Sequence, residues 1–209
     1  MGVVRDIFRH SHNPVADLTA LGYVYNLSES ALNTAITGPT SFATTTPTLI
    51  VVNAAASGMT FIPLYLSLQQ AGTVAGGAVS VLMEVDNANR YTSGGTACTA
   101  MNAWINGVGI PGSLTALPTG ITAFSVTGSA ITATDAAGIR IWNSIVGQDV
   151  SPAEGVSNEL VWTPPAGAPE FLSSSATLGA SWLINTFAAT TGPTWFYAMK
   201  IAAFPTSEL

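Results

Sequence analysis

Alternation of apolar and polar side chains is the dominant pattern along this chain. Between residues 79 and 86 the odd positions are valine or methionine, whereas the even positions include Ser80, Glu84 and Asp86, with Leu82 as the apolar exception. A period of two is typical of a strand with one face in a core and the other toward solvent. The sequence therefore predicts a half-buried strand over these residues.

Two further segments share this period. Residues 61–69 have isoleucine or leucine at every even position and include Pro63, which lacks a backbone N–H and so predicts an edge position or a β-bulge. Residues 195–201 carry bulky side chains on both faces, which favours a strand in the middle of a sheet.

Six more segments bring the expected number of strands to about nine. They are residues 20–27, 48–53, 121–126, 139–145, 160–163 and 182–187. Glycine-containing turn signals separate them, for example at 57–58, 93–95 and 127–128. Helical periodicity is scarce, and its best candidate is 28–35, where Ser28 offers an N-cap. The pattern predicts an all-β fold: a single jelly roll or antiparallel β-sandwich of about eight to nine strands with little helix.

The distribution of charged residues separates an N-terminal segment from the rest of the chain, whereas the other residue types are spread evenly. Residues 18–209 are expected to form one jelly-roll domain, and residues 1–17 an N-terminal arm. The arm contains Arg5, Arg9, His10 and His12, whereas the rest of the chain is acidic. These four basic residues are therefore the candidate subunit-contact residues of the arm.

The low charge content of the chain indicates what kind of partner it has. Charged residues make up only 8% of the 209 residues, against roughly 25% in ordinary soluble domains, and the mean hydropathy is +0.43. No apolar run approaches the length of about 18 residues that a membrane helix needs, and no secretory signal is expected at residues 1–18. A surface this poor in charge is explained if neighbouring subunits cover much of it. The net charge of −6 argues against wrapping nucleic acid with the body of the fold.

Candidate catalytic chemistry is sparse, because both histidines lie in the arm and Cys98 is the single cysteine. Cys98 is expected to be a buried structural thiol. The spacing of His10 and His12 matches the H-x-H fragment of cupin metal sites, but the accompanying glycine and glutamate are missing. A glycosidase pair among the loop carboxylates stays open as a less favoured alternative. We therefore expect no enzyme, with no catalytic, cofactor-binding or metal-binding residues and no small-molecule substrate.

Residues 86–91 form the most polar stretch, with Asp86, Asn87, Asn89 and Arg90 in close succession. We interpret them as a structured turn in which Asx side chains accept bonds from backbone amides and Arg90 pairs with Glu84 or Asp86. The alternative is a Ca²⁺ site, which the oxygen-rich side chains favour and the arginine disfavours. The five tryptophans are spread along the chain, which is more typical of core and interface anchors than of a sugar-binding platform.

A short basic arm at residues 3–12 precedes a charge-poor body rich in Ser, Thr, Gly and Ala, and a closing strand at 194–201 runs toward Pro205. In these features, and in the segments 49–55 and 86–91, the chain resembles the jelly-roll structural proteins of icosahedral bacterial and archaeal viruses. The resemblance implies a capsid-type subunit located in the virion.

The same resemblance implies that the protein works by assembly. Its partners would be copies of itself, in a trimer or larger homo-oligomer, and other virion proteins. Arg5 and Arg9 would tether the arm to a neighbouring subunit, an internal membrane or the packaged genome. The alternative is a decoration or fibre-head protein that binds glycans or a receptor on the host surface.

Overall fold

The computed structural model describes residues 2–31, 33–71, 78–104, 114–146, 159–165 and 168–209. Helix α1 spans Val3–His10, α2 spans Pro14–Ala20, and a short 3₁₀ helix covers Thr206–Glu208. The strands are β1 (Val24–Ser28), β2 (Ile36–Thr37), β3 (Leu49–Asn53), β4 (Met59–Gln70), β5 (Val79–Asp86), β6 (Tyr91–Gly94), β7 (Thr96–Ala97), β8 (Thr99–Asn102), β9 (Ile121–Ser125), β10 (Ile131–Ala133), β11 (Ile139–Val146), β12 (Glu159–Trp162), β13 (Leu172–Ser173), β14 (Ala180–Phe187) and β15 (Thr194–Pro205).

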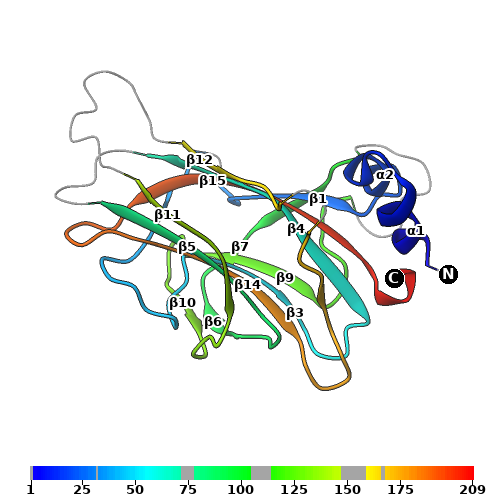
Figure 1. Ribbon diagram of the computed structural model, residues 1–209. Coiled ribbons are helices and arrows are strands. Elements are labelled where there is room, and N and C mark those ends of the chain that lie inside the picture. Colours follow the sequence, from blue (N-terminus) through cyan, green and yellow to red (C-terminus); the bar gives the residue numbers. More distant parts are fainter. Residues whose placement is uncertain (1, 32, 72–77, 105–113, 147–158, 166–167) are drawn as a thin grey trace.

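The strands form two large antiparallel sheets that pack face to face (Figure 1). Sheet A has the order β12-β4-β15-β1-β8, with β13 beside β4 and β2 beside β15. Sheet B has the order β11-β5-β14-β3-β9-β7. A small separate sheet pairs β6 with β10.

The order of the strands along the chain makes this sandwich a jelly roll. Strands β1, β4, β12 and β15 lie in sheet A, and β3, β5, β11 and β14 lie in sheet B, so successive strands mostly cross between the sheets. The units β12-β4-β15-β1 and β11-β5-β14-β3 have the order that two Greek keys produce. The prediction of an all-β jelly roll is confirmed, and each predicted strand segment overlaps an observed strand.

The core lies between the two sheets, at the inward positions that the alternation marks. Met83 of β5, Trp182 of β14 and Ile201 of β15 are each 0% exposed within this core. β15 is central, between β4 and β1, as its two bulky faces predict. Pro63 lies at a bulge, the second of its two predicted positions, because the register between β4 and β15 shifts opposite it.

Strand β5 is buried on both faces, which differs from the half-buried strand that its alternation predicts. Glu84 is 6% exposed and Asp86 is 5% exposed. The small sheet packs over the outer face of sheet B, where Ile131 and Ala133 form a buried cluster with Leu183, the register partner of Glu84. Tertiary packing therefore covers a polar face that the sequence pattern assigns to solvent.

The segment predicted as an N-terminal arm forms a pair of helices that pack on the outer face of sheet A, at one end of the sandwich (Figure 1). Val4 of α1 and Leu18 of α2 are fully buried in a cluster with Ile62 and Phe204 of the sheet. The segment packs there because it has an apolar face of its own to bury.

The prediction of a helix at 28–35 is wrong. Ser28 ends β1, and the described residues between 29 and 35 contain no helix. The helix start lies elsewhere: Asn13 Oδ1 accepts a hydrogen bond from Ala16 N at 3.2 Å, and Pro14 occupies the first helical position of α2.

Candidate functional site

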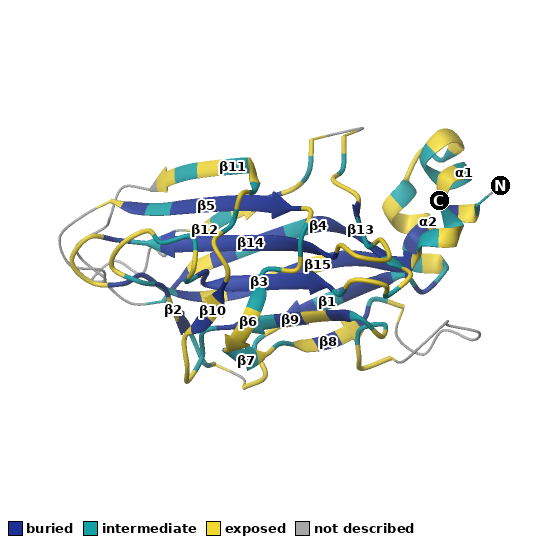
Figure 2. Ribbon diagram, turned by 90° about the horizontal axis from the view of Figure 1, so that it is seen from below, coloured by how far each residue is buried: buried dark blue, intermediate teal, exposed yellow. Residues whose placement is uncertain are grey.

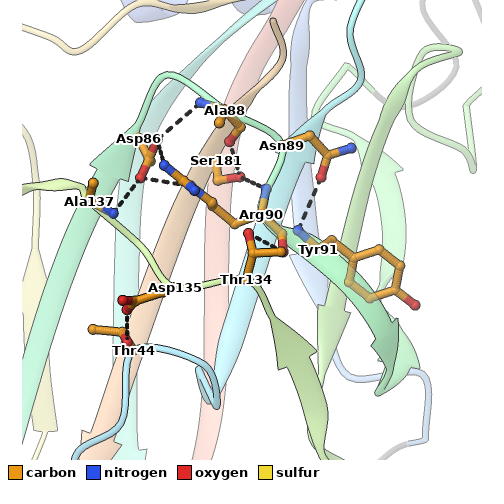
Figure 3. A network of polar contacts seen from close by, with 10 residues as sticks. All are labelled: Thr44, Asp86, Ala88, Asn89, Arg90, Tyr91, Thr134, Asp135, Ala137 and Ser181. Carbon is orange, nitrogen blue, oxygen red and sulfur yellow. Dashed lines mark hydrogen bonds and ion pairs between the residues drawn. The ribbon is translucent and has the colours of Figure 1, made fainter.

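The polar turn between β5 and β6 is a closed network around Asp86 (Figure 3). Asp86 Oδ2 accepts hydrogen bonds from Arg90 Nε at 2.9 Å and Ala137 N at 3.0 Å. Asp86 Oδ1 accepts from Arg90 Nη2 and from Ala88 N, each at 3.1 Å. Of the two carboxylates that the sequence offers to Arg90, the structure therefore pairs it with Asp86, in a two-pronged ion pair.

Ser181 joins this network from the neighbouring strand β14. Its hydroxyl accepts from Arg90 N at 2.9 Å and donates to Ala88 O at 2.7 Å. Asn89 Oδ1 accepts from Tyr91 N at 3.1 Å. The side chains of Asn89 and of its neighbour Asn87 are otherwise exposed. The turn thus anchors the corner between β5 and β6 to the middle of sheet B.

The hydrogen bonding of Asp86 argues against the Ca²⁺ alternative. Each carboxylate oxygen already accepts two hydrogen bonds, and the Arg90 guanidinium occupies the side from which a cation would approach. No group of three or more His, Cys, Asp or Glu side chains that could hold a metal ion occurs in the part of the chain that the structure describes.

Of the basic residues predicted as contact residues, Arg5, Arg9 and His10 lie on α1, and His12 lies in the segment that joins the two helices. Arg5, Arg9, His10 and His12 are exposed. His10 is the last residue of α1, with Nδ1 3.2 Å from the backbone oxygen of Asp6, and His12 lies between the two helices. The H-x-H spacing therefore belongs to a helix end outside the sandwich, not to a strand inside a barrel. No helix among the described residues has the length and apolar character to cross a membrane.

A cluster that the sequence did not suggest gathers around Glu29, directly after β1. Glu29 Oε2 accepts hydrogen bonds from Ser125 Oγ at 2.6 Å and Thr127 Oγ1 at 2.9 Å, and the Tyr197 hydroxyl lies 3.5 Å away. The same hydroxyl lies 3.1 Å from Cys98 Sγ. The members come from distant parts of the chain, so no local motif could have revealed the cluster.

The electrostatics of this cluster favour a structural role. Burial raises the pKa of the Glu29 carboxyl, but hydrogen bonds from Ser125, Ser30 and Thr127 outweigh that effect, and the pKa lies below its ordinary value. Burial raises the pKa of the half-buried Cys98 thiol to about 12 and also raises the pKa of Tyr197. At neutral pH the cluster therefore combines a carboxylate with a protonated thiol and a protonated phenol. These groups form a hydrogen-bonded contact between strands, and none of them is an activated nucleophile.

The tryptophans divide between the interior and the surface. Trp162, Trp182 and Trp195 are buried in the main core, at 7%, 0% and 0% exposure. Trp104 is 39% exposed, and Trp142 of β11 is half-buried. Three of the five therefore serve as core anchors and are not available to a ligand on the surface.

These observations define the class of the chain: a single jelly-roll β-sandwich with a helical pair packed on sheet A. Searches against family models, curated proteins and solved structures found no match for this chain.

Proposed function

We propose that this chain is a capsid-type structural protein of a bacterial or archaeal virus, which assembles with copies of itself into the virion shell. Viral capsid domains are among the proteins built as double-sheet jelly rolls, as are lectin domains and cupins. Since a fold alone does not fix a function, the proposal depends on the surface that this fold presents.

The observation that carries the proposal is the exposure of large apolar side chains on edge strands. Ile139 and Ile145 of β11, at the edge of sheet B, are 73% and 68% exposed, and Val161 of β12, at the edge of sheet A, is 51% exposed. Figure 2 shows β11 as largely teal and yellow beside the buried strand β5. Proteins that stay monomeric usually protect such edges with charges, and Arg140 is the one charged residue of β11. Contact with another subunit would cover this edge.

The helical pair supports the same proposal through its charge. Arg5 and Arg9 are exposed on α1, where they can contact a neighbouring subunit, lipid headgroups or the packaged genome. Deleting residues 1–12 would also remove Val4 from its cluster with Ile62. The double substitution R5E/R9E tests the contact without that loss of packing, and unchanged assembly of this variant would exclude the two arginines from it.

The alternative, a decoration or fibre-head protein that binds host glycans, would need an exposed aromatic platform. Trp162, Trp182 and Trp195 are buried, which leaves that alternative with less support. Binding of the purified protein to selected sugars on a glycan array would favour the alternative over a shell protein.

The proposal is tested by size-exclusion chromatography with light scattering and by electron microscopy of the full chain. We expect oligomers or shells for the unchanged protein. The variant I139K/I145K should shift toward smaller species, because two ammonium groups on β11 oppose contact with a neighbouring subunit. Leu178→Lys, at a position 51% exposed in the loop before β14, is the matched control and should assemble normally. A monodisperse monomer at every concentration would overturn the proposal.

A further inference from the structure

The two outer faces of the sandwich differ in what covers them. The outer face of sheet B carries the small sheet β6–β10, and Ile50, Val52 and Leu183 are buried beneath it. The outer face of sheet A is covered at one end by α1 and α2, which bury Ile62 and Phe204. Beyond the helices the same face of sheet A continues across five strands with exposed side chains.

We call this second part the open face and define it by Ser67, Met101, Glu159, Val161, Phe196 and Lys200. The strand register aligns them on one side of the sheet: Phe196 lies opposite Gln69, which lies opposite Glu159, and Lys200 lies opposite Asn26, which lies opposite Met101. The residues between them on β15, Tyr197 and Met199, point into the core. The open face is therefore a continuous surface and not a set of scattered side chains.

Three of the six side chains that define this surface are large and apolar. Val161 is 51% exposed, Met101 is 45% exposed and Phe196 is 39% exposed, although each lies on a strand of the sheet. The row through its centre is made of Val161, Ser67 and Ala198, whose side chains are short, and Ser67 Oγ donates a hydrogen bond to Glu159 Oε1 at 3.1 Å. A sheet face with three exposed large apolar side chains and short side chains at its centre is suited to contact with another protein surface.

Two charges of opposite sign interrupt it. Lys200 on β15 and Glu159 on β12 are the only charged residues in the five strands of the open face. They are offset by four residues along the strands and by two strands across the sheet, which is about 16 Å and too far for an ion pair within one chain. Ser67 lies midway between them, since its register partners are Ala198 and Val161.

This arrangement is self-complementary. Consider a two-fold axis that lies in the interface plane above Ser67, perpendicular to the line from Lys200 to Glu159. This axis brings two copies face to face and places each Lys200 against Glu159 of the other copy, so that both charges are paired. From this geometry we propose that the open face binds the open face of a second copy, through two symmetric Lys200–Glu159 ion pairs on either side of the short side chains around Ser67. The inference rests on the proposed function, because it names one of the contacts through which the chain would assemble.

Charge exchange tests the contact. Lys200→Glu and Glu159→Lys each place like charges together at both ion pairs, and each should weaken self-association by about tenfold or more. The double variant K200E/E159K restores opposite charges and should associate within about threefold of the unchanged chain. An equimolar mixture of the two single variants should form a mixed dimer, because every ion pair is then complementary.

Analytical ultracentrifugation of the full-length variants measures these effects, and circular dichroism checks that each is folded. Glu170→Lys makes the same charge change as Glu159→Lys at an exposed position outside the open face, and it should leave association unchanged. A zero-length carbodiimide cross-linker provides an independent measurement on the unchanged protein, in which it should join Lys200 to Glu159 between chains.

The outcomes separate this inference from the proposed function. An unchanged chain that remains monomeric would overturn both. An unchanged chain that assembles, while the single charge variants associate with unaltered affinity and no Lys200–Glu159 cross-link forms, would overturn the open-face contact alone. Weakening by each single variant with rescue by the double variant and the mixture would establish it.

Discussion

Hydrogen-bonded carboxylates hold the corners of this sandwich together. The carboxylate of Asp86 accepts four hydrogen bonds from three residues, and that of Glu29 links the end of β1 to Ser125 at the end of β9. Hydrogen bonds to a charged acceptor are stronger than those between neutral groups. Both carboxylates therefore stabilise the fold, and each leads to a prediction about stability.

The substitution Asp86→Ala leaves Arg90 without its partner and Ala137 N without its acceptor. We expect the free energy of unfolding to fall by about 3 kcal/mol, as when one member of a buried ion pair is removed. Urea unfolding followed by tryptophan fluorescence measures the change. Asn87→Ala alters the adjacent exposed side chain and should stay within about 0.5 kcal/mol of the unchanged protein. Equal losses in the two variants would contradict the role of the network.

Glu29 predicts how stability depends on pH. Its folded pKa is lowered, so the unfolded chain binds the proton more readily. The stabilisation from Glu29 is therefore complete above the ordinary glutamate pKa of about 4.3 and is lost as the pH falls through the lower folded value. Unfolding free energies measured from pH 6 to pH 3 should decline less steeply for Glu29→Gln than for the unchanged chain. Glu170→Gln removes an exposed carboxylate and should keep the original slope; a parallel decline in all three proteins would refute this assignment.

The strands could be predicted from their sequence patterns, whereas the helical pair was missed. Strands could be predicted because alternation survives wherever one side of a strand lies in the core, as in β4 and β15. The helical pair could have been found from Asn13 and Pro14, which form an N-cap and first-turn signal, and from the spacing of Val4, Ile7 and Phe8. The charge of this segment suggested an exposed arm, but its apolar residues determined where it packs.

The helical pair predicts a stability effect within a single element. Leu18 of α2 is 0% exposed, whereas Val15 on the same helix is 44% exposed. Leu18→Ala should lower the free energy of unfolding by about 3 kcal/mol, because it leaves a cavity against sheet A. Val15→Ala should change it by less than about 0.5 kcal/mol, and both values follow from denaturant titration. A negligible effect of Leu18→Ala would mean that the helices do not stay packed on the sheet.

The whole molecule combines a closed interior with a surface poor in charge. The jelly-roll topology brings the ends of the chain to the same part of sheet A, where Val3 N donates to Glu208 Oε2 at 3.2 Å (Figure 1). One outer face is covered by the chain's own small sheet, and the other remains partly open. Self-association through the open face and the edge strand β11 would cover the apolar side chains that the fold leaves exposed, which is how the tests proposed above connect fold to function.

The sequence by itself determined the fold class, the strands and the polar turn, because alternation, turn glycines and Asx chemistry act between residues close together in the chain. It also determined the low charge content on which the proposal of assembly draws. Only the tertiary structure decided the surroundings of residues that meet from afar: Glu84 became buried, Arg90 paired with Asp86 and not with Glu84, and Glu29 met Ser125 and Tyr197. The placement of Lys200 and Glu159 on one face likewise depends on the register of β15, β4 and β12. Such contacts depend on which strands become neighbours, and the pattern within any single strand does not specify that.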